Sequence, residues 1–291
     1  MHLNDLLRGK NIDPEQVLVL RHRPIEPKLN KVLPWLAAER PELFNAYQAF
    51  QGEKLERVMT GAKYVASFIA HGPGRALFVG LYAIGSFKAL TPEQFDKVPS
   101  IVELRILGKM AESDPSRERI LHFDLQLQDF YSHWKGKLVV DWPPPERSWW
   151  RRSHRNDIAV ALIHAESMLE EAANKPWDEI VLAWDELRIM PSRLKAALRE
   201  WRGIYYIFDE SDGKGYVGSA YGTANLLGRW ENYAAIGHGG NRLLLKRNPK
   251  NFKFSILQRV SPDLDPTDVI RLESTWKERL HTRDPFGLND N

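Results

Sequence analysis

Residues 203–218 read GIYYIFDESDGKGYVG and are typical of a β-hairpin. The apolar and aromatic run that ends at Asp209 predicts one strand, the polar residues after it predict a turn, and Lys214–Ala220 predicts the returning strand. Side chains alternate between the two faces of a strand, so each hairpin strand places its aromatic residues on a defined face. We expect Tyr205 and Tyr216, one from each strand, to lie close together.

Two helices and a third strand follow the hairpin. Thr223 is a suitable N-cap for a helix to about Ala235, and the spacing places Arg229 at the edge of its apolar face. Phe252–Val260 predicts the third strand. A last helix places Glu273 in the middle of an apolar stripe, where a carboxylate is costly unless it is paired or bound to a cation. Arg229 and Glu273 are therefore candidates for contact with a ligand.

The C-terminal segment, residues 203–291, resembles the GIY-YIG nuclease domain. The resemblance lies in the tripeptides GIY and YVG of the hairpin, followed in order by Arg229, Glu273 and Asn289. It implies a small three-stranded antiparallel sheet flanked by helices. It also implies hydrolysis of a phosphodiester with one divalent metal ion, Mg²⁺ or Mn²⁺.

The same resemblance implies a role for each residue of the motif. Glu273 would hold the metal ion, since hard cations take carboxylate oxygen. Arg229 would stabilise the charge that develops on the phosphate. Tyr205 or Tyr216 would position or deprotonate the attacking water. Asn289 would hold Glu273, or a strand near the site, in place.

Two residues are candidates for proton transfer, and several candidates have alternative interpretations. Some family members carry a histidine one turn after the arginine, where this chain has Tyr233; either Tyr233 or His238 of the following loop would serve. The hairpin tyrosines could be ordinary strand aromatics. Arg229 could be a surface arginine, and Glu273 could pair with Lys277 four residues later.

Two basic segments predict contacts with nucleic acid. Residues 242–259 contain six basic residues and no acidic residue, which beside a nuclease site favours phosphate contact. Residues 147–155 interleave tryptophans with arginines, a pattern that can stack bases or, alternatively, form a tryptophan corner of the core flanked by solvated arginines. The residues that we expect to contact nucleic acid are Arg242, Lys246, Arg247, Lys250, Trp149, Trp150, Arg151 and Arg152.

The N-terminal part predicts an α+β domain rich in strands. Residues 1–60 are rich in helix formers, and 156–174 has the spacing of a helix. Short strands with few helices between them favour a small barrel or a strongly curved sheet. The predicted strands are Lys63–Ala70, Ala76–Ile84, Ile101–Leu107, Ile120–Leu127 and Lys137–Trp142. We place the domain boundary near 175: residues 1–175 would recognise the target, and 176–291 would be the nuclease domain with a helical lead-in.

The composition limits which cellular compartment and which kinds of metal site we expect. The chain has 291 residues and a net charge of +3, too small by itself to argue for nucleic-acid binding. It has no cysteine, which excludes disulfides and zinc sites built on thiolates. No apolar run approaches the roughly 20 residues that span a bilayer, and the first residues lack the apolar core of a signal peptide. We expect a cytoplasmic protein with no membrane association.

The sequence therefore predicts a phosphodiesterase: a metal-dependent DNA endonuclease, acting in restriction or defence against foreign or modified DNA. A homing or repair nuclease remains an alternative, as does an RNA substrate. A non-catalytic nucleic-acid-binding protein with a decayed nuclease domain is the alternative outside the enzymes. A homodimer is compatible with cleavage of both strands, because a single site cuts one strand at a time.

Overall fold

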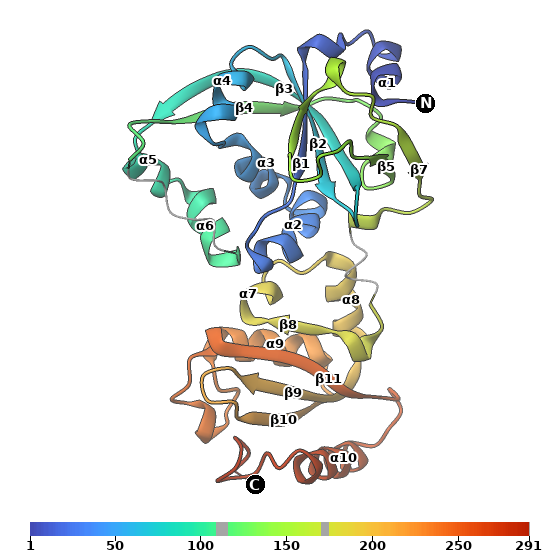
Figure 1. Ribbon diagram of the computed structural model, residues 1–291. Helices are drawn as coiled ribbons and strands as arrows, with labels where there is room; N and C mark the ends of the chain where they lie inside the picture. Colours follow the sequence, from blue (N-terminus) through green and yellow to red (C-terminus); the bar gives the residue numbers. More distant parts are fainter. Residues whose placement is uncertain (109–115, 170–174, 291) are drawn as a thin grey trace. The chain divides into compact units, whose positions relative to one another are not determined.

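The computed structural model describes residues 1–108, 116–169 and 175–290, and it confirms the α+β class (Figure 1). The chain divides into two units, Met1–Glu171 and Ala172–Asn291, each with its own sheet. None of the helices in the described ranges is both long and apolar enough to cross a membrane.

The first unit is built on a seven-stranded sheet. Its strands are β1 (Val17–His22), β2 (Tyr64–Ala70), β3 (Arg75–Leu90), β4 (Ile120–Leu127), β5 (Leu138–Asp141), β6 (Trp150–Arg152) and β7 (Val160–Ile163). The order is β6-β1-β2-β3-β5-β7, with β4 paired to the second half of β3. β1 and β2 are parallel, whereas the other strand pairs given by the structure are antiparallel.

Helices between β1 and β2 explain why these two strands are parallel, since a parallel pair needs a long crossover. The crossover consists of α2 (Pro27–Glu39), α3 (Pro41–Ala49) and α4 (Glu53–Met59). α2 and α3 each begin with a proline, whose fixed φ suits the first turn of a helix. The remaining helices of this unit are α1 (Leu3–Gly9), α5 (Pro92–Asp96) and α6 (Pro99–Gly108).

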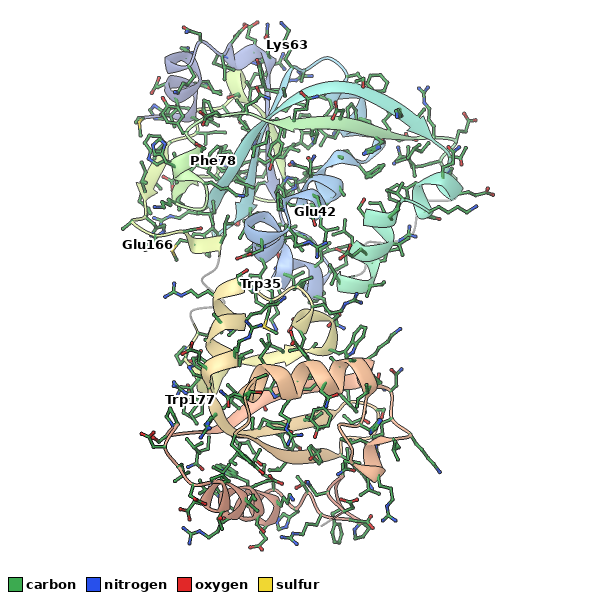
Figure 2. The ribbon with its side chains drawn as sticks, turned by 180° about the vertical axis from the view of Figure 1, so that it is seen from behind. Trp35, Glu42, Lys63, Phe78, Glu166 and Trp177 are labelled. Carbon is green, nitrogen blue, oxygen red and sulfur yellow. The ribbon has the colours of Figure 1, made fainter. Side chains whose placement is uncertain are left out.

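The sheet of the first unit is curled (Figure 1). The long strand β3 belongs to two parts of it, since its first half pairs with β2 and β5 and its second half pairs with β4. The register of β3 shifts against both β2 and β4, and such irregularities bend and twist a strand. Phe68 and Phe78 pack together in the core that this curvature encloses; Phe78 is labelled in Figure 2. Within the described residues β6 and β7 are not paired with each other. The expected barrel therefore does not close, and the curved sheet is the correct alternative.

Two predicted elements of the first unit are wrong. Ile101–Leu107, expected as a strand, lies in α6, where the buried Ile101, Leu104 and Leu107 recur at helical spacing. The helix expected over 156–174 is replaced, in its described part, by β7 and short irregular segments. β7 pairs with β5, and this backbone pairing outweighs the preference for a helix that the spacing of the apolar side chains indicates.

The second unit carries a four-stranded antiparallel sheet in the order β10-β9-β11-β8. Its strands are β8 (Val181–Ala183), β9 (Arg202–Asp209), β10 (Gly215–Ala220) and β11 (Phe252–Val260). Its helices are α7 (Trp184–Leu187), α8 (Ser192–Glu200), α9 (Asn225–Ile236) and α10 (Pro266–Arg279). Three strands were expected in this sheet. The fourth, β8, pairs with β11 and leaves β10 as the edge strand on the other side.

Candidate active site

The two motif glycines of the hairpin are required by close packing. In the β9–β10 register Gly218 lies opposite Tyr205, and a Cβ added to Gly218 would lie 2.4 Å from the Tyr205 hydroxyl oxygen. A Cβ added to Gly203 would lie 2.3 Å from the carbonyl oxygen of Gln258, where the register of β9 and β11 shifts. Real side chains do not approach so closely, so neither position accepts a larger residue without movement of its neighbours. The glycine at 218 thus makes room for the Tyr205 ring.

Three tyrosine hydroxyls form one hydrogen-bonded chain. Tyr205 of β9 donates to Tyr233 of α9 over 3.3 Å, and Tyr233 donates to Tyr216 of β10 over 3.1 Å. The rings lie with centroids 5.7 to 6.5 Å apart. Tyr205 and Tyr233 are fully buried, and Tyr216 is partly exposed. Tyr216 is therefore the member of the chain that a substrate can reach most directly.

Burial raises the pKa of Tyr205 and Tyr216 well above that of a free phenol. The neighbouring Tyr233 raises the pKa of both further. The positive charge of Arg229 acts in the opposite direction on each, whereas the carboxylate of Glu273 adds to the increase at Tyr216. At neutral pH these two hydroxyls are protonated. Only added positive charge near Tyr216 would bring its proton within reach of a base.

Arg229 lies on the exposed side of α9, further out than the core edge that its spacing predicted. It lies one helical turn before Tyr233 on α9, and its positive charge opposes the rise in the pKa of Tyr205 and Tyr216. Within the described residues its side chain makes no hydrogen bond or ion pair. The guanidinium group is therefore available to an anion.

Glu273 of α10 lies on the other side of the edge strand. Its Oε1 is 2.8 Å from Nζ of Lys277, and its Oε2 accepts a hydrogen bond from the Ser219 hydroxyl of β10. Because side chains alternate along β10, Ser219 lies on the face opposite Tyr216, and the buried Val217 and Val269 pack together on that face. The site thus spans both faces of β10 at the edge of the sheet. The ion pair between Glu273 and Lys277, which the sequence offered as an alternative interpretation of Glu273, is therefore present.

Asn289 fixes β10 from the chain that follows α10. Its side-chain Oδ1 accepts from the backbone N–H of Val217 over 2.9 Å, and its Nδ2 donates to the Val217 carbonyl over 2.8 Å. The residue is fully buried, and its own backbone N–H donates to Thr282. Val217 is next to Tyr216, so Asn289 holds the strand that carries the exposed end of the tyrosine chain.

His238 lies in the loop after α9, and the hydrogen bonds that the structure gives it are local. Its Nδ1 accepts from the backbone N–H of Gly240, and its carbonyl accepts from Asn241. By contrast, Tyr233 belongs to the hydroxyl chain. Of the two candidates for proton transfer, the structure brings Tyr233 to the other site residues.

Two of the arginines expected at nucleic acid are engaged inside the protein. Arg247 pairs with the buried Asp209 and, through two hydrogen bonds of 2.8 Å, with Asp212. Arg151 is buried; it donates to the carbonyls of Pro143 and Pro145 and lies over the Trp142 ring. Neither guanidinium is offered to a phosphate. The charge pattern of the sequence could not separate these two from their neighbours, because Arg247 pairs with aspartates 35 and 38 residues earlier and Arg151 binds backbone carbonyls, which carry no sequence signal.

The other six residues expected at nucleic acid keep part of their surface in solvent. Arg242, Lys246 and Lys250 are exposed along the segment before β11, and Lys250 lies over the ring of Trp184. In the first unit Trp149 is exposed, while Trp150 and Arg152 of β6 are partly buried. These residues can contact a ligand without rearrangement of the core.

The donor set fits a hydrated Mg²⁺ ion and does not fit a metal held entirely by protein. In the described ranges no group of three or more histidine, aspartate and glutamate side chains could enclose an ion. Mg²⁺ keeps several waters and is often bound by one or two carboxylates together with substrate phosphate. The partly exposed carboxylate of Glu273 is such a ligand. The sequence did not suggest Ser219 as a residue of this site. Its only signal is its position two residues after Val217, on the same face of β10.

Comparisons with known proteins return little. No family model matches the chain, and no curated protein matches it. Among solved structures, the chain is similar to the catalytic domain of the homing endonuclease I-TevI, at 24% sequence identity. The match covers 31% of this chain and 98% of that one, with a TM-score of 0.27. A TM-score this low does not decide fold or activity.

Proposed function

We propose that the chain is a metal-dependent DNA endonuclease in which residues 176–291 hydrolyse a phosphodiester and residues 1–175 select the target. The observation that carries the proposal is the chain of three tyrosine hydroxyls beside the unpaired Arg229. An aromatic cluster of the core would not need three linked hydroxyls, and a surface arginine would not need to lie beside them. The order of the GIY-YIG motif supports the same assignment.

Arg229 is proposed to bind the phosphate that is cleaved. A guanidinium presents a planar fork of donors that matches phosphate oxygens, and its charge does not depend on pH in the physiological range. Its exposure and its lack of a partner among the described residues leave that fork free. As negative charge develops on the phosphate oxygens, donors already in place stabilise it without reorganisation.

The tyrosine chain is proposed to orient the attacking water. Tyr216 stands at the exposed end, and Tyr233 connects it to the buried Tyr205. A phenol of raised pKa stays protonated at neutral pH and cannot accept a proton, so Tyr216 would act as a hydrogen-bonding group for the water. The positive charge of Arg229 opposes the rise in the pKa of Tyr216, and only the phenolate form of Tyr216 could take the proton of the water.

Glu273 is proposed to hold the divalent ion, Mg²⁺ or Mn²⁺. When bound, the ion would neutralise charge on the phosphate and stabilise the leaving 3′ oxygen. Ser219 holds one carboxylate oxygen of Glu273 and Lys277 the other, so both fix its orientation. Asn289 keeps β10, and with it Tyr216 and Ser219, in register.

The proposed role is restriction or defence against foreign or modified DNA, in the cytoplasm. The division of the chain into two compact units, one of which could select a target while the other cleaves it, supports this role. Cleavage of both strands would bring together two copies of the chain, each with one site.

A plasmid-nicking assay tests the proposal. Wild type should nick or cut at least one of plain, methylated and hydroxymethylated DNA with Mg²⁺ or Mn²⁺ and none with EDTA. Glu273→Gln and Arg229→Ala should each lower the rate by about a hundredfold or more. Matched controls lie on α10: Glu278→Gln and Arg271→Ala alter exposed residues of the same type and should keep the wild-type rate.

The outcomes separate the alternatives. If wild type binds DNA and cuts none of the three, the protein is a binding protein with a decayed nuclease domain. If it cuts matched RNA and leaves DNA intact, the substrate is RNA.

A further inference from the structure

A pocket of about 820 Å³ opens in the first unit, at the carboxyl end of β1. Its walls come from four segments: the end of β1 with the loop after it, the start of α2, the end of α3 with the residues after it, and the segment that leads into β6. A smaller pocket of about 380 Å³ shares Arg21, Arg23 and Glu146 with it and reaches the end of β2 at Ala70. β1 and β2 are the parallel pair of this sheet. Ligands of sheets with parallel strands commonly bind outside the carboxyl ends of those strands.

A buried histidine in the wall of this pocket interacts with Gln48 and has one ring nitrogen left without a partner among the described residues. His22 is 2% exposed, and its Nε2 has no hydrogen-bond partner among the described residues. Its ring lies edge-on to Phe44 and Tyr47, so aromatic carbon surrounds it. Burial lowers the pKa of His22 to about 4, and the ring is neutral at physiological pH. A neutral imidazole carries one donor and one acceptor, and an unpaired buried nitrogen is unfavourable unless a ligand or water meets it.

Aromatic surfaces line the rest of the pocket. Tyr47 and Phe50 come from α3 and the residue after it, and Trp149 comes from the opposite segment. Trp149 is 38% exposed, and its indole contacts no other aromatic ring in the part of the chain that the structure describes. Flat aromatic surfaces of this kind bind planar rings by stacking, largely independently of the identity of the ring.

The cations of the pocket divide into a buried group and an exposed group. Arg21 is buried and held by the Glu146 carboxylate at 2.8 Å and by backbone carbonyls, so it forms part of the wall. Arg23 and Arg147 are exposed at the rim. The Arg147 side chain makes no hydrogen bond or ion pair with any described residue. A ligand with a planar ring inside and anionic groups outside would match both parts.

We infer that this pocket binds a nucleobase turned out of a DNA strand. Tyr47, Phe50 and Trp149 would contact its ring, and His22 would hydrogen-bond its polar edge. Arg23 and Arg147 would contact the phosphates beside the extruded nucleotide. Removing a base from the stack costs free energy, which stacking and edge contacts in a pocket offset. The inference rests on the proposed function for the choice of DNA, and it adds how a target would be read.

Binding is measured on the full chain without metal, so cleavage plays no part. The probes are short duplexes with a single 2-aminopurine in a mismatch, whose fluorescence rises when the base leaves the stack. Wild type should bind them and raise the fluorescence. Trp149→Ala and Arg147→Ala, both exposed, should weaken binding by at least about tenfold and abolish the fluorescence rise. Phe87→Ala and Arg119→Ala, exposed residues of the same unit outside the pocket, should behave as wild type.

The competing results are distinct. Binding without a rise in fluorescence, or pocket variants that match the controls, would overturn the inference. So would competition by free deoxynucleoside monophosphates at concentrations equal to those of the duplex, which would identify a site for free nucleotides. If wild type cuts DNA in the nicking assay but fails here, the pocket assignment falls and the nuclease stands. If wild type binds and raises the fluorescence here but cuts nothing in the nicking assay, the nuclease assignment falls and the pocket assignment stands.

Discussion

Nζ of Lys277 lies 2.8 Å from Oε1 of Glu273, one turn further along α10, and the Lys277 side chain is buried. The carboxylate proposed to hold the metal thus already has a cationic partner. A divalent ion would have to share this carboxylate with the ammonium group or displace it.

Lys277→Met should therefore change metal use and stability in opposite directions. Without the competing ammonium, half-maximal cleavage should need less Mg²⁺. The loss of the partner should lower the free energy of unfolding by about 1–3 kcal/mol, since a partly buried carboxylate is left unpaired. Metal titration of the nicking rate and urea unfolding measure the two effects. Arg271→Met, which removes an exposed pair on the same helix, should alter neither. An unchanged Mg²⁺ requirement would show that the lysine does not compete.

Tyr233→Phe removes the central hydroxyl of the chain and keeps the ring. The rate of cleavage should fall by about tenfold to a hundredfold, because Tyr216 then loses its connection to Tyr205. Single-turnover cleavage gives the rate of the chemical step. Tyr206→Phe is the control, since Tyr206 lies on the other face of β9 and outside the chain. Equal rates for the two variants would assign the tyrosine chain to packing alone.

Gly218→Ala should damage both the fold and the site. The new methyl would lie within 2.4 to 2.9 Å of the Tyr205 ring, which has to move. Overpacking of this kind costs about 1–3 kcal/mol and would break the first hydrogen bond of the tyrosine chain. Thermal unfolding and the nicking rate measure the two effects. Gly222→Ala, at a glycine with open space around it, should leave both unchanged. A crystal structure of the variant with an unmoved Tyr205 would contradict the packing argument.

The stability of the protein should fall as pH is lowered from about 6.5 to about 4. Burial depresses the pKa of His22 from 6.5 to about 4, so between these values the unfolded chain binds a proton that the folded chain does not. Stability therefore rises with pH in this window, by up to about 3 kcal/mol from this residue. Urea unfolding across the window measures the slope for wild type and for His22→Gln. Equal slopes in the two proteins would show that His22 does not carry the effect.

The sequence predicted the second unit better than the first because its signals are local. The β9–β10 hairpin, β11 and the two later helices follow from turn residues, alternation and helical spacing within short windows. β2 and β4 were placed for the same reason. By contrast, β1 is a short, fully buried run without alternation, and α6 has apolar spacing that also suits a strand. β7 depends on its partner β5, which no local pattern reveals.

The candidate site shows the same division. The residue types and their order in the sequence are enough to indicate Tyr205, Tyr216, Arg229 and Glu273 as candidates. The hydrogen bond from Tyr205 to Tyr233, and the engagement of Arg247 by Asp209 and Asp212, join residues far apart in the chain. The unpartnered Nε2 of His22 is a property of three-dimensional burial, and composition carries no trace of it.

The clamp that Asn289 places on Val217 has a consequence for the timing of biosynthesis. The two residues are 72 positions apart, and the strand that carries Tyr216 is made long before its clamp. On the ribosome, β10 can pair with β9 as soon as the hairpin is made, but the free edge of β10 at Val217 is held only after that stretch has been translated. The candidate site would therefore be completed only when the residues after α10 are in place, which makes it among the last parts of this unit to form.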